Sequence, residues 1–177
     1  MMRKFRRIDL TNATEDYFLK VGEEAYISFS NVTQVPLHIA TQDGTYYEMH
    51  IIPANTGGTT GGNTGTETRL CPNNQLYTNA FKFAYVSGYS GGLDSAYMTY
   101  SAFRIGIAFN AITAWICNRT QYKSVRLVMD QYGHYGGWPV IGLIDSLWQD
   151  TTTPWTSLGT IVFPQSSSGE ILVRRLR

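Results

Sequence analysis

The sequence predicts an all-β protein: a single-domain β-sandwich with jelly-roll-like connections and about ten strands. Apolar and polar residues alternate with a period of two along most of the chain, and no long window has an apolar stripe at helical spacing. The length of 177 residues suits one domain with one core. Because so many short strands need a closed barrel or two packed sheets, the uneven connection lengths favour a sandwich.

The strands are expected where this alternation is strongest. In EAYISFS, residues 24–30, the side chains of Ala25, Ile27 and Phe29 alternate with more polar neighbours, which predicts a strand with one face toward water. Further strands are predicted, in chain order, at residues 45–52, 80–86, 97–110, 113–119, 123–130, 140–144, 159–163 and 170–176. The segment 97–110 is expected to be one long strand, and FPQSSSG is expected to separate the last two strands. A short helical turn is allowed only at residues 145–150.

One segment has no means of building a core. Residues 53–69, PANTGGTTGGNTGTETR, consist mostly of Gly and Thr and contain no apolar residue larger than Ala54. We predict that this segment is a long loop between two strands. Loops of more than about 12 to 15 residues are usually functional or disordered, and this one lacks side chains whose packing would offset its ordering entropy. We therefore expect it to become ordered only when a partner covers it.

The ends of the chain are basic and its body is acidic. Residues 8–173 carry 7 positive and 13 negative charges, so half of the 14 positive charges lie at the ends. We expect residues 1–10 to form a basic arm on a domain of residues 11–177. Because the two ends of a domain often lie close together, the basic residues of both ends are expected to form one docking patch for an acidic protein partner. The residues of this predicted patch are Arg3, Lys4, Arg6, Arg7, Arg174, Arg175 and Arg177.

The same features bear on other partners and on location. Seven positive charges divided between two ends of an acidic body disfavour nucleic acid as the partner. The basic start MMRKFRRIDL is not followed by the apolar run of a secretory signal, and no segment approaches the ~20 apolar residues of a membrane span. We therefore predict neither an export signal nor membrane insertion.

Several of these elements together resemble bacteriophage virion proteins. They are the basic MRKFRRIDL start, the Tyr/Thr/Gly-rich β body, the Gly/Thr stretch at residues 55–66, and the closing strand 170–176 in SSSGEILVRRLR. The similarity is to the small β-sandwich proteins that decorate capsids or form tail and fibre appendages. It implies a non-enzymatic, oligomeric part of a virion, made in the host cytoplasm and bound to other virion proteins. No functional residue carries over from it.

Aromatic residues gather in DQYGHYGGWP, residues 130–139, which we predict to be a loop between two strands. Its glycines allow the chain to turn with aromatic faces outward. Such a loop suits a protein interface, where Tyr and Trp are enriched, and this is our first interpretation. The alternative is a host surface glycan, whose sugar rings would stack on the aromatic faces. The candidate binding residues are Asp130, Gln131, Tyr132, His134, Tyr135 and Trp138.

One motif suggests catalysis and is weighed as a distant third possibility. GYSGG, residues 88–92, matches the G-x-S-x-G elbow of α/β hydrolases, and Ser90, Asp130 and His134 occur in the chain order of such enzymes. The elbow requires a helix after the serine, whereas the residues after 92 alternate with strand period. We therefore predict a hairpin loop here and a protein that is not an enzyme.

The histidines and cysteines suggest no cofactor. His38, His50 and His134 lack the spacing of a metal site, and we predict neither a metal nor another cofactor. Cys71 and Cys117 lie in or beside apolar segments and are predicted to be buried free thiols.

Overall fold

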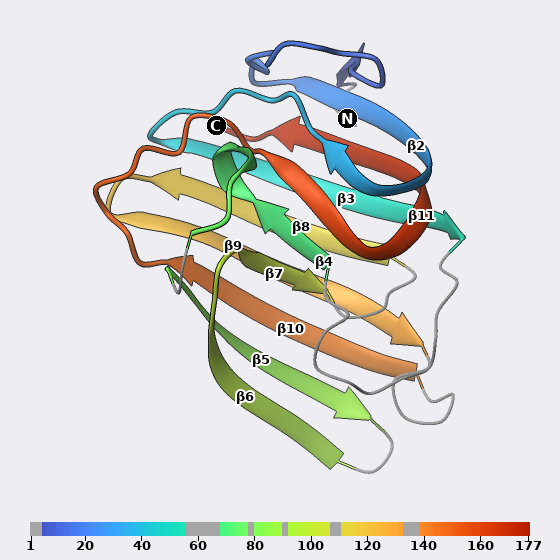
Figure 1. The fold of residues 1–177 in the computed structure, drawn as a ribbon, viewed down its shortest axis with the longest axis vertical. Coiled ribbons are helices and arrows are strands. Elements are labelled where there is room, and N and C mark those ends of the chain that lie inside the picture. Colours follow the sequence, from blue (N-terminus) through green and yellow to red (C-terminus); the bar gives the residue numbers. More distant parts are fainter. Residues whose placement is uncertain (1–4, 56–67, 78–79, 90–91, 107–110, 133–138) are drawn as a thin grey trace.

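The computed structural model describes residues 5–55, 68–77, 80–89, 92–106, 111–132 and 139–177 (Figure 1). These residues form eleven strands and one short 3-10 turn, η1 (Pro72–Asn74). The strands are β1 (Arg6–Asp9), β2 (Glu23–Pro36), β3 (Thr45–Asn55), β4 (Thr68–Cys71), β5 (Phe81–Tyr89), β6 (Gly92–Tyr100), β7 (Phe103–Gly106), β8 (Ala111–Arg119), β9 (Tyr122–Tyr132), β10 (Pro139–Trp148) and β11 (Thr160–Arg175).

Most strands lie in one large, curled sheet. Its order is β1-β2-β11-β3-β8-β9-β10-β5-β6, and the described pairs are antiparallel except for β1 beside β2. Direct antiparallel pairing joins β5 to β6, β8 to β9 and β9 to β10. The last strand, β11, in contrast, lies between two strands from the first third of the sequence, β2 and β3.

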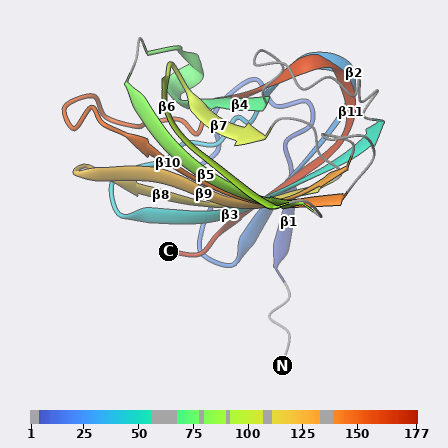
Figure 2. The same cartoon turned by 90° about the horizontal axis from the view of Figure 1, so that it is seen from below.

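A smaller layer, made of β4 and β7, covers one side of this sheet (Figure 2). Strand β11 belongs to both layers, because its start, Thr160 to Val162, pairs with β4 and its second half pairs with β3. Between these halves the register with β2 shifts twice, between Val162 and Gly169, and such β-bulges bend a strand. The bend lets β2 and β11 leave the large sheet and continue over its inner side.

The hydrophobic core fills the space between the two layers. Strands of the large sheet point every second side chain inward, as with Tyr47, Met49 and Ile51 of β3, which are fully buried. An aromatic cluster lies at the end of the core nearest β7. Its ring centroids are as close as 4.6 Å between Phe81 and Phe103. The cluster comprises Tyr77, Phe81, Phe103, Trp148 and Trp155.

One charged side chain is buried beside this cluster. The Nζ of Lys123 lies 4.1 Å from the ring centroid of Trp148 and donates a hydrogen bond of 2.6 Å to the carbonyl of Thr153. Burial lowers the pKa of Lys123, although the nearby Asp150 opposes this shift. The cation–π contact and the hydrogen bond together compensate for the loss of water around the ammonium group.

The structure confirms the predicted all-β, single-domain fold, in a sandwich-like arrangement of two unequal layers; jelly-roll connectivity is not confirmed. The prediction of one strand at 97–110 is wrong, because β6 ends at Tyr100 and β7 begins at Phe103 in the smaller layer. The predicted break at FPQSSSG is also wrong, since β11 continues through it. Residues 145–148 belong to β10 and not to a helical turn.

The Gly/Thr segment is shorter at both ends than predicted. Residues 53–55 belong to β3, and Thr68 and Arg69 belong to β4, which pairs with both β11 and β7. Residues 56–67 lie outside the described part of the chain. The predicted basic arm is likewise shorter, because residues 6–9 form β1 and Leu10 is buried in the core.

The turn η1 is held to the segment before β11 by one side chain. Asn73 Nδ2 donates to the carbonyl of Pro154 at 2.9 Å. Its Oδ1 accepts hydrogen bonds from the backbone N–H groups of Thr156 and Ser157, at 2.9 and 3.0 Å. The backbone of Asn73 has a φ of 53°, a left-handed conformation that asparagine tolerates better than most residues.

We expect Asn73→Ala to lower the free energy of unfolding by about 2 kcal/mol, because it removes these bonds and strains the turn. Urea denaturation measures this loss. Gln75→Ala, a change at an exposed neighbour, serves as the control and should stay within about 0.5 kcal/mol of the unsubstituted chain. Equal effects of the two substitutions would show that the Asn73 side chain does not hold the turn.

Candidate functional site

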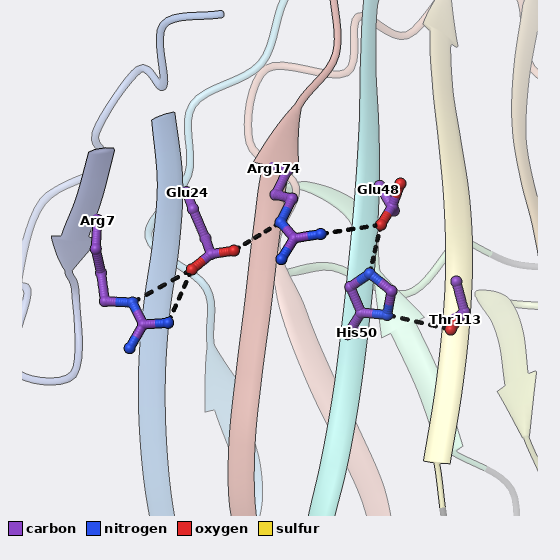
Figure 3. A network of polar contacts seen from close by, with 6 residues as sticks. All are labelled: Arg7, Glu24, Glu48, His50, Thr113 and Arg174. Atoms are coloured by element: carbon purple, nitrogen blue, oxygen red, sulfur yellow. Dashed lines mark hydrogen bonds and ion pairs between the residues drawn. The ribbon is translucent and has the colours of Figure 1, made fainter. Parts of the chain in front are cut away.

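The two ends of the chain meet at one buried carboxylate (Figure 3). Arg7 of β1 donates from Nε and Nη2 to Oε1 of Glu24, at 3.2 and 3.1 Å. Arg174 of β11 donates from Nε to Oε2 of the same carboxylate, at 2.6 Å. Because β1 and β11 both flank β2, the sheet order itself brings these arginines to Glu24. The expectation that the two basic ends lie together is therefore correct for Arg7 and Arg174.

The network continues across the sheet from Arg174. Its Nη1 lies 3.4 Å from Oε1 of Glu48 on β3, and that carboxylate also contacts Nε2 of His50. The other ring nitrogen of His50 lies 3.1 Å from the hydroxyl of Thr113 on β8. These polar contacts therefore link β1, β2, β11, β3 and β8 on one face (Figure 3).

The network fixes the charge state of Glu24. Its side chain is only 6% exposed. Burial alone would raise the pKa of Glu24, but the hydrogen bonds from Arg174 and Arg7 outweigh burial and hold this pKa below its usual value of 4.5. Glu24 is therefore an ionised, structural partner of both chain ends.

The predicted docking patch needs revision in the light of these contacts. Besides Arg7 and Arg174, Arg6 lies 3.8 Å from Glu23, and Arg175 donates to the carbonyls of Leu19 and Arg177. The guanidinium of Arg175 also lies over the ring of Phe18. The side chains of Arg6, Arg7, Arg174 and Arg175 thus bind groups of their own chain, whereas Arg177 is exposed. Arg3 and Lys4 lie outside the described residues.

A single cross-strand row of residues carries most of these charges. We call it the charge row, and we call the side of the large sheet turned away from β4 and β7 the outer face. Beyond Glu48, the register continues to Trp115 of β8, Arg126 of β9 and Asp145 of β10, and Arg126 Nη2 binds Asp145 Oδ2 at 2.7 Å. In sheet order the charge row is Arg7, Glu24, Arg174, Glu48, Trp115, Arg126 and Asp145.

Large apolar side chains surround the charge row. Trp115 is 41% exposed, although it occupies the central strand of the sheet. Most of the large apolar side chains that are exposed in the described part of the chain lie on this outer face, because they alternate with the inward residues of their strands. They are Ile52, Trp115, Tyr122, Val128 and Leu143, together with Leu176 just after β11.

A shallow pocket of about 490 Å³ opens beside Trp115. Its walls include the side chains of Tyr46, Cys117, Tyr122, Arg126 and Leu176. Cys117 is a free thiol that is only half-buried, so its predicted burial is wrong, whereas Cys71 is buried as expected. Burial raises the pKa of the Cys71 thiol.

The predicted aromatic loop at 130–139 is only partly described. Asp130, Gln131 and Tyr132 lie in β9, and Tyr132 pairs with Pro139 of β10. Asp130 is therefore in a strand, as the predicted strand 123–130 implies, whereas Gln131 and Tyr132 are strand residues and not loop residues as predicted. His134, Tyr135 and Trp138 lie outside the described residues.

The hydrolase motif occupies a hairpin. Tyr89 of β5 pairs with Gly92 of β6, and the chain after the motif is a strand, where a nucleophile elbow requires a helix. Ser90 itself lies outside the described residues.

Sequence reasoning missed the outer face as a site. In TAWICNR the alternation already placed Thr113, Trp115 and Cys117 opposite the buried Ala114 and Ile116. A tryptophan at an outward position of a strand was the available signal. The juxtaposition of Trp115 with Glu48 and Arg126 depends on strand pairing, which no local pattern reports.

Comparisons with protein-family models and with curated proteins found no match for this chain. In the described residues, no helix has the length and apolar character needed to cross a membrane.

Proposed function

We propose that this protein is a non-enzymatic structural subunit of a bacteriophage virion, a capsid-decoration or tail/fibre appendage protein that docks on other virion proteins through its outer face. The observation that carries the proposal is the exposed Trp115 in the middle of that face. Its cross-strand neighbours are Glu48, which is ion-paired with Arg174, and Arg126, which is ion-paired with Asp145. Trp, Tyr and Arg are the residues most enriched at the centres of protein interfaces.

The electrostatics of the face favour docking over catalysis. A catalytic carboxylate is most effective when its pKa lies near the working pH, whereas the pKa of Glu24 is held below its usual value by two arginines. Asp145 is similarly bound to Arg126. Paired charges of this kind fix the register of a partner and reject partners whose charges do not match.

We expect Trp115→Ser to reduce incorporation of the chain into particles about 30-fold, as for the loss of a central interface tryptophan. Particles purified on density gradients from cultures that produce the chain would be quantified by mass spectrometry. Leu76→Ser is the matched control, because Leu76 is also exposed but lies beside η1, away from the outer face. Absence of the chain from particles, or equal incorporation of both variants, would refute the proposal.

The shallow pocket beside Trp115 supports a second candidate, a carbohydrate-binding module of a phage tail. Trp115 and Tyr122, two of the aromatic residues in its walls, could stack on a sugar, and Arg126 could bond the hydroxyls. A glycan array with the purified protein separates the candidates. A signal that Trp115→Ser or Trp138→Ala removes would favour glycan binding, and a blank array would favour the protein interface.

A further inference from the structure

We infer that the outer face binds a second copy of this chain, packed face to face, with Trp115 on the two-fold axis. The inference rests on the proposed function, because it names a partner for the same face. It is carried by the order of the charges along the charge row. When the row of a second copy is reversed about Trp115, the charged residues near Trp115 in one copy lie opposite residues of the opposite charge in the other copy.

The charges match in pairs on the two sides of Trp115. One strand away lie Glu48 on one side and Arg126 on the other. Two strands away lie Arg174 and Asp145. A two-fold axis that runs along β8 exchanges the two sides, so Glu48 faces the partner's Arg126 and Arg174 faces the partner's Asp145. Since packed sheets lie about 10 Å apart, the long Glu and Arg side chains can meet midway.

The charge pattern also rejects the other face-to-face arrangement. An axis along the charge row, at right angles to β8, would place each residue of the row opposite its own copy. Glu48 would then face the partner's Glu48, and Arg126 the partner's Arg126. Juxtaposed like charges cost several kcal/mol at an interface, so the axis along β8 is favoured over the axis along the charge row.

The neighbouring row of the outer face fits the same axis. It contains Leu172, His50, Thr113, Val128 and Leu143 in register. Rotation about β8 places Leu172 over the partner's Leu143, so that apolar side chains cover each other beside the matched charges.

The decisive experiment exchanges charges between two chains. Light scattering should give the unsubstituted protein a mass of twice 19.9 kDa at micromolar concentration. Glu48→Arg alone or Arg126→Glu alone should raise the dimer dissociation constant about 100-fold, because each homodimer then holds two like-charge contacts. An equimolar mixture of the two variants should dimerise again, because both contacts between unlike chains become complementary. A mixture that stays monomeric, with both variants folded by circular dichroism, would overturn the inference.

A second measurement needs no change to the charge row. Cys117 lies on β8 two residues from Trp115, so the proposed axis brings it near the partner's Cys117. A short bismaleimide should therefore cross-link the native protein into covalent dimers. Cys117→Ser should abolish the cross-link, whereas Cys71→Ser should not, because Cys71 is buried. Absence of cross-linked dimers at concentrations where light scattering reports a dimer would refute the axis.

The outcomes separate this inference from the proposed function. A monomeric protein whose incorporation into particles still depends on Trp115 would overturn the two-fold dimer and leave the virion role intact. A dimer with the predicted mixing behaviour that is absent from particles would leave the dimer intact and overturn the virion role.

Discussion

Replacing Gly159 with alanine is expected to lower the free energy of unfolding by about 3 kcal/mol or more, from the combined cost of an unfavourable φ and of overpacking. Gly159 precedes β11 at the point where three segments meet. Its carbonyl accepts a hydrogen bond from the N–H of Leu37 at 2.9 Å, and the next residue, Thr160, pairs with Cys71 of β4. A side chain at this point must therefore displace backbone and not merely other side chains.

The geometry gives two separate reasons for this loss. Gly159 has a φ of +96°, a conformation that L side chains rarely adopt. A Cβ at this position would lie 1.9 Å from the carbonyl oxygen of Cys71, far inside contact distance. Because that oxygen belongs to the backbone of β4, relief of the clash must move β4 away from β11.

Gly22→Ala provides a control that isolates the first reason. Gly22 has a φ of +92°, close to that of Gly159, but no atom lies within 4 Å of a Cβ built there. We expect this substitution to cost about 1 kcal/mol, the strain of the backbone conformation alone. Denaturant unfolding of both variants measures the difference. If both lost the same free energy, the close approach of β4 to β11 would not be a real constraint.

Glu24→Gln is expected to lower the free energy of unfolding by about 2 kcal/mol at neutral pH, the range found for hydrogen bonds to charged groups. The substitution keeps the shape of the side chain but removes the charge that Arg7 and Arg174 share. Arg7 is 61% exposed and can return to water at little cost. Arg174 is only 31% exposed and keeps Glu48 as its partner, so most of the loss comes from its bond to Glu24.

The effect of Glu24→Gln should depend on pH in a definite direction. Since folding lowers the pKa of Glu24 below 4.5, the unfolded chain takes up this proton more readily than the folded chain does. The contribution of Glu24 is therefore complete above pH 4.5 and is lost as the pH falls through the lower pKa of the folded state. The two unfolding free energies should differ most near about pH 7 and converge as the pH falls through the lower pKa of the folded state.

The matched control for this experiment is Glu170→Gln. Glu170 is exposed on β11 and accepts one hydrogen bond, from the hydroxyl of Tyr26 at 2.9 Å. We expect its substitution to change stability by no more than about 0.5 kcal/mol. A constant difference between Glu24→Gln and the unsubstituted chain across the pH range would mean that the charge of Glu24 does not support the fold.

The sequence alone determined the fold class and most strand positions. Period-two alternation is a local property, so residues 24–30, 45–52, 113–119 and 123–130 could be assigned to strands without knowledge of their neighbours. The same locality explains the errors. Phe103 and Ile105 alternate with their neighbours and so resemble the continuation of one strand, but the chain passes from β6 to β7 at Ser101 and Ala102 and buries both residues in the other layer.

Only the tertiary structure decided which strands are neighbours, and the candidate site depends on that choice. Glu24 and Arg174 are 150 residues apart in sequence and become partners because β11 inserts between β2 and β3. Trp115 acquires charged neighbours on both sides only through the register of β3, β8 and β9. Register is set by packing of the whole core, since a slip of one residue would turn every inward side chain of a strand outward. Local composition identified the basic ends, and long-range pairing arranged Arg7 and Arg174 into one row with Trp115.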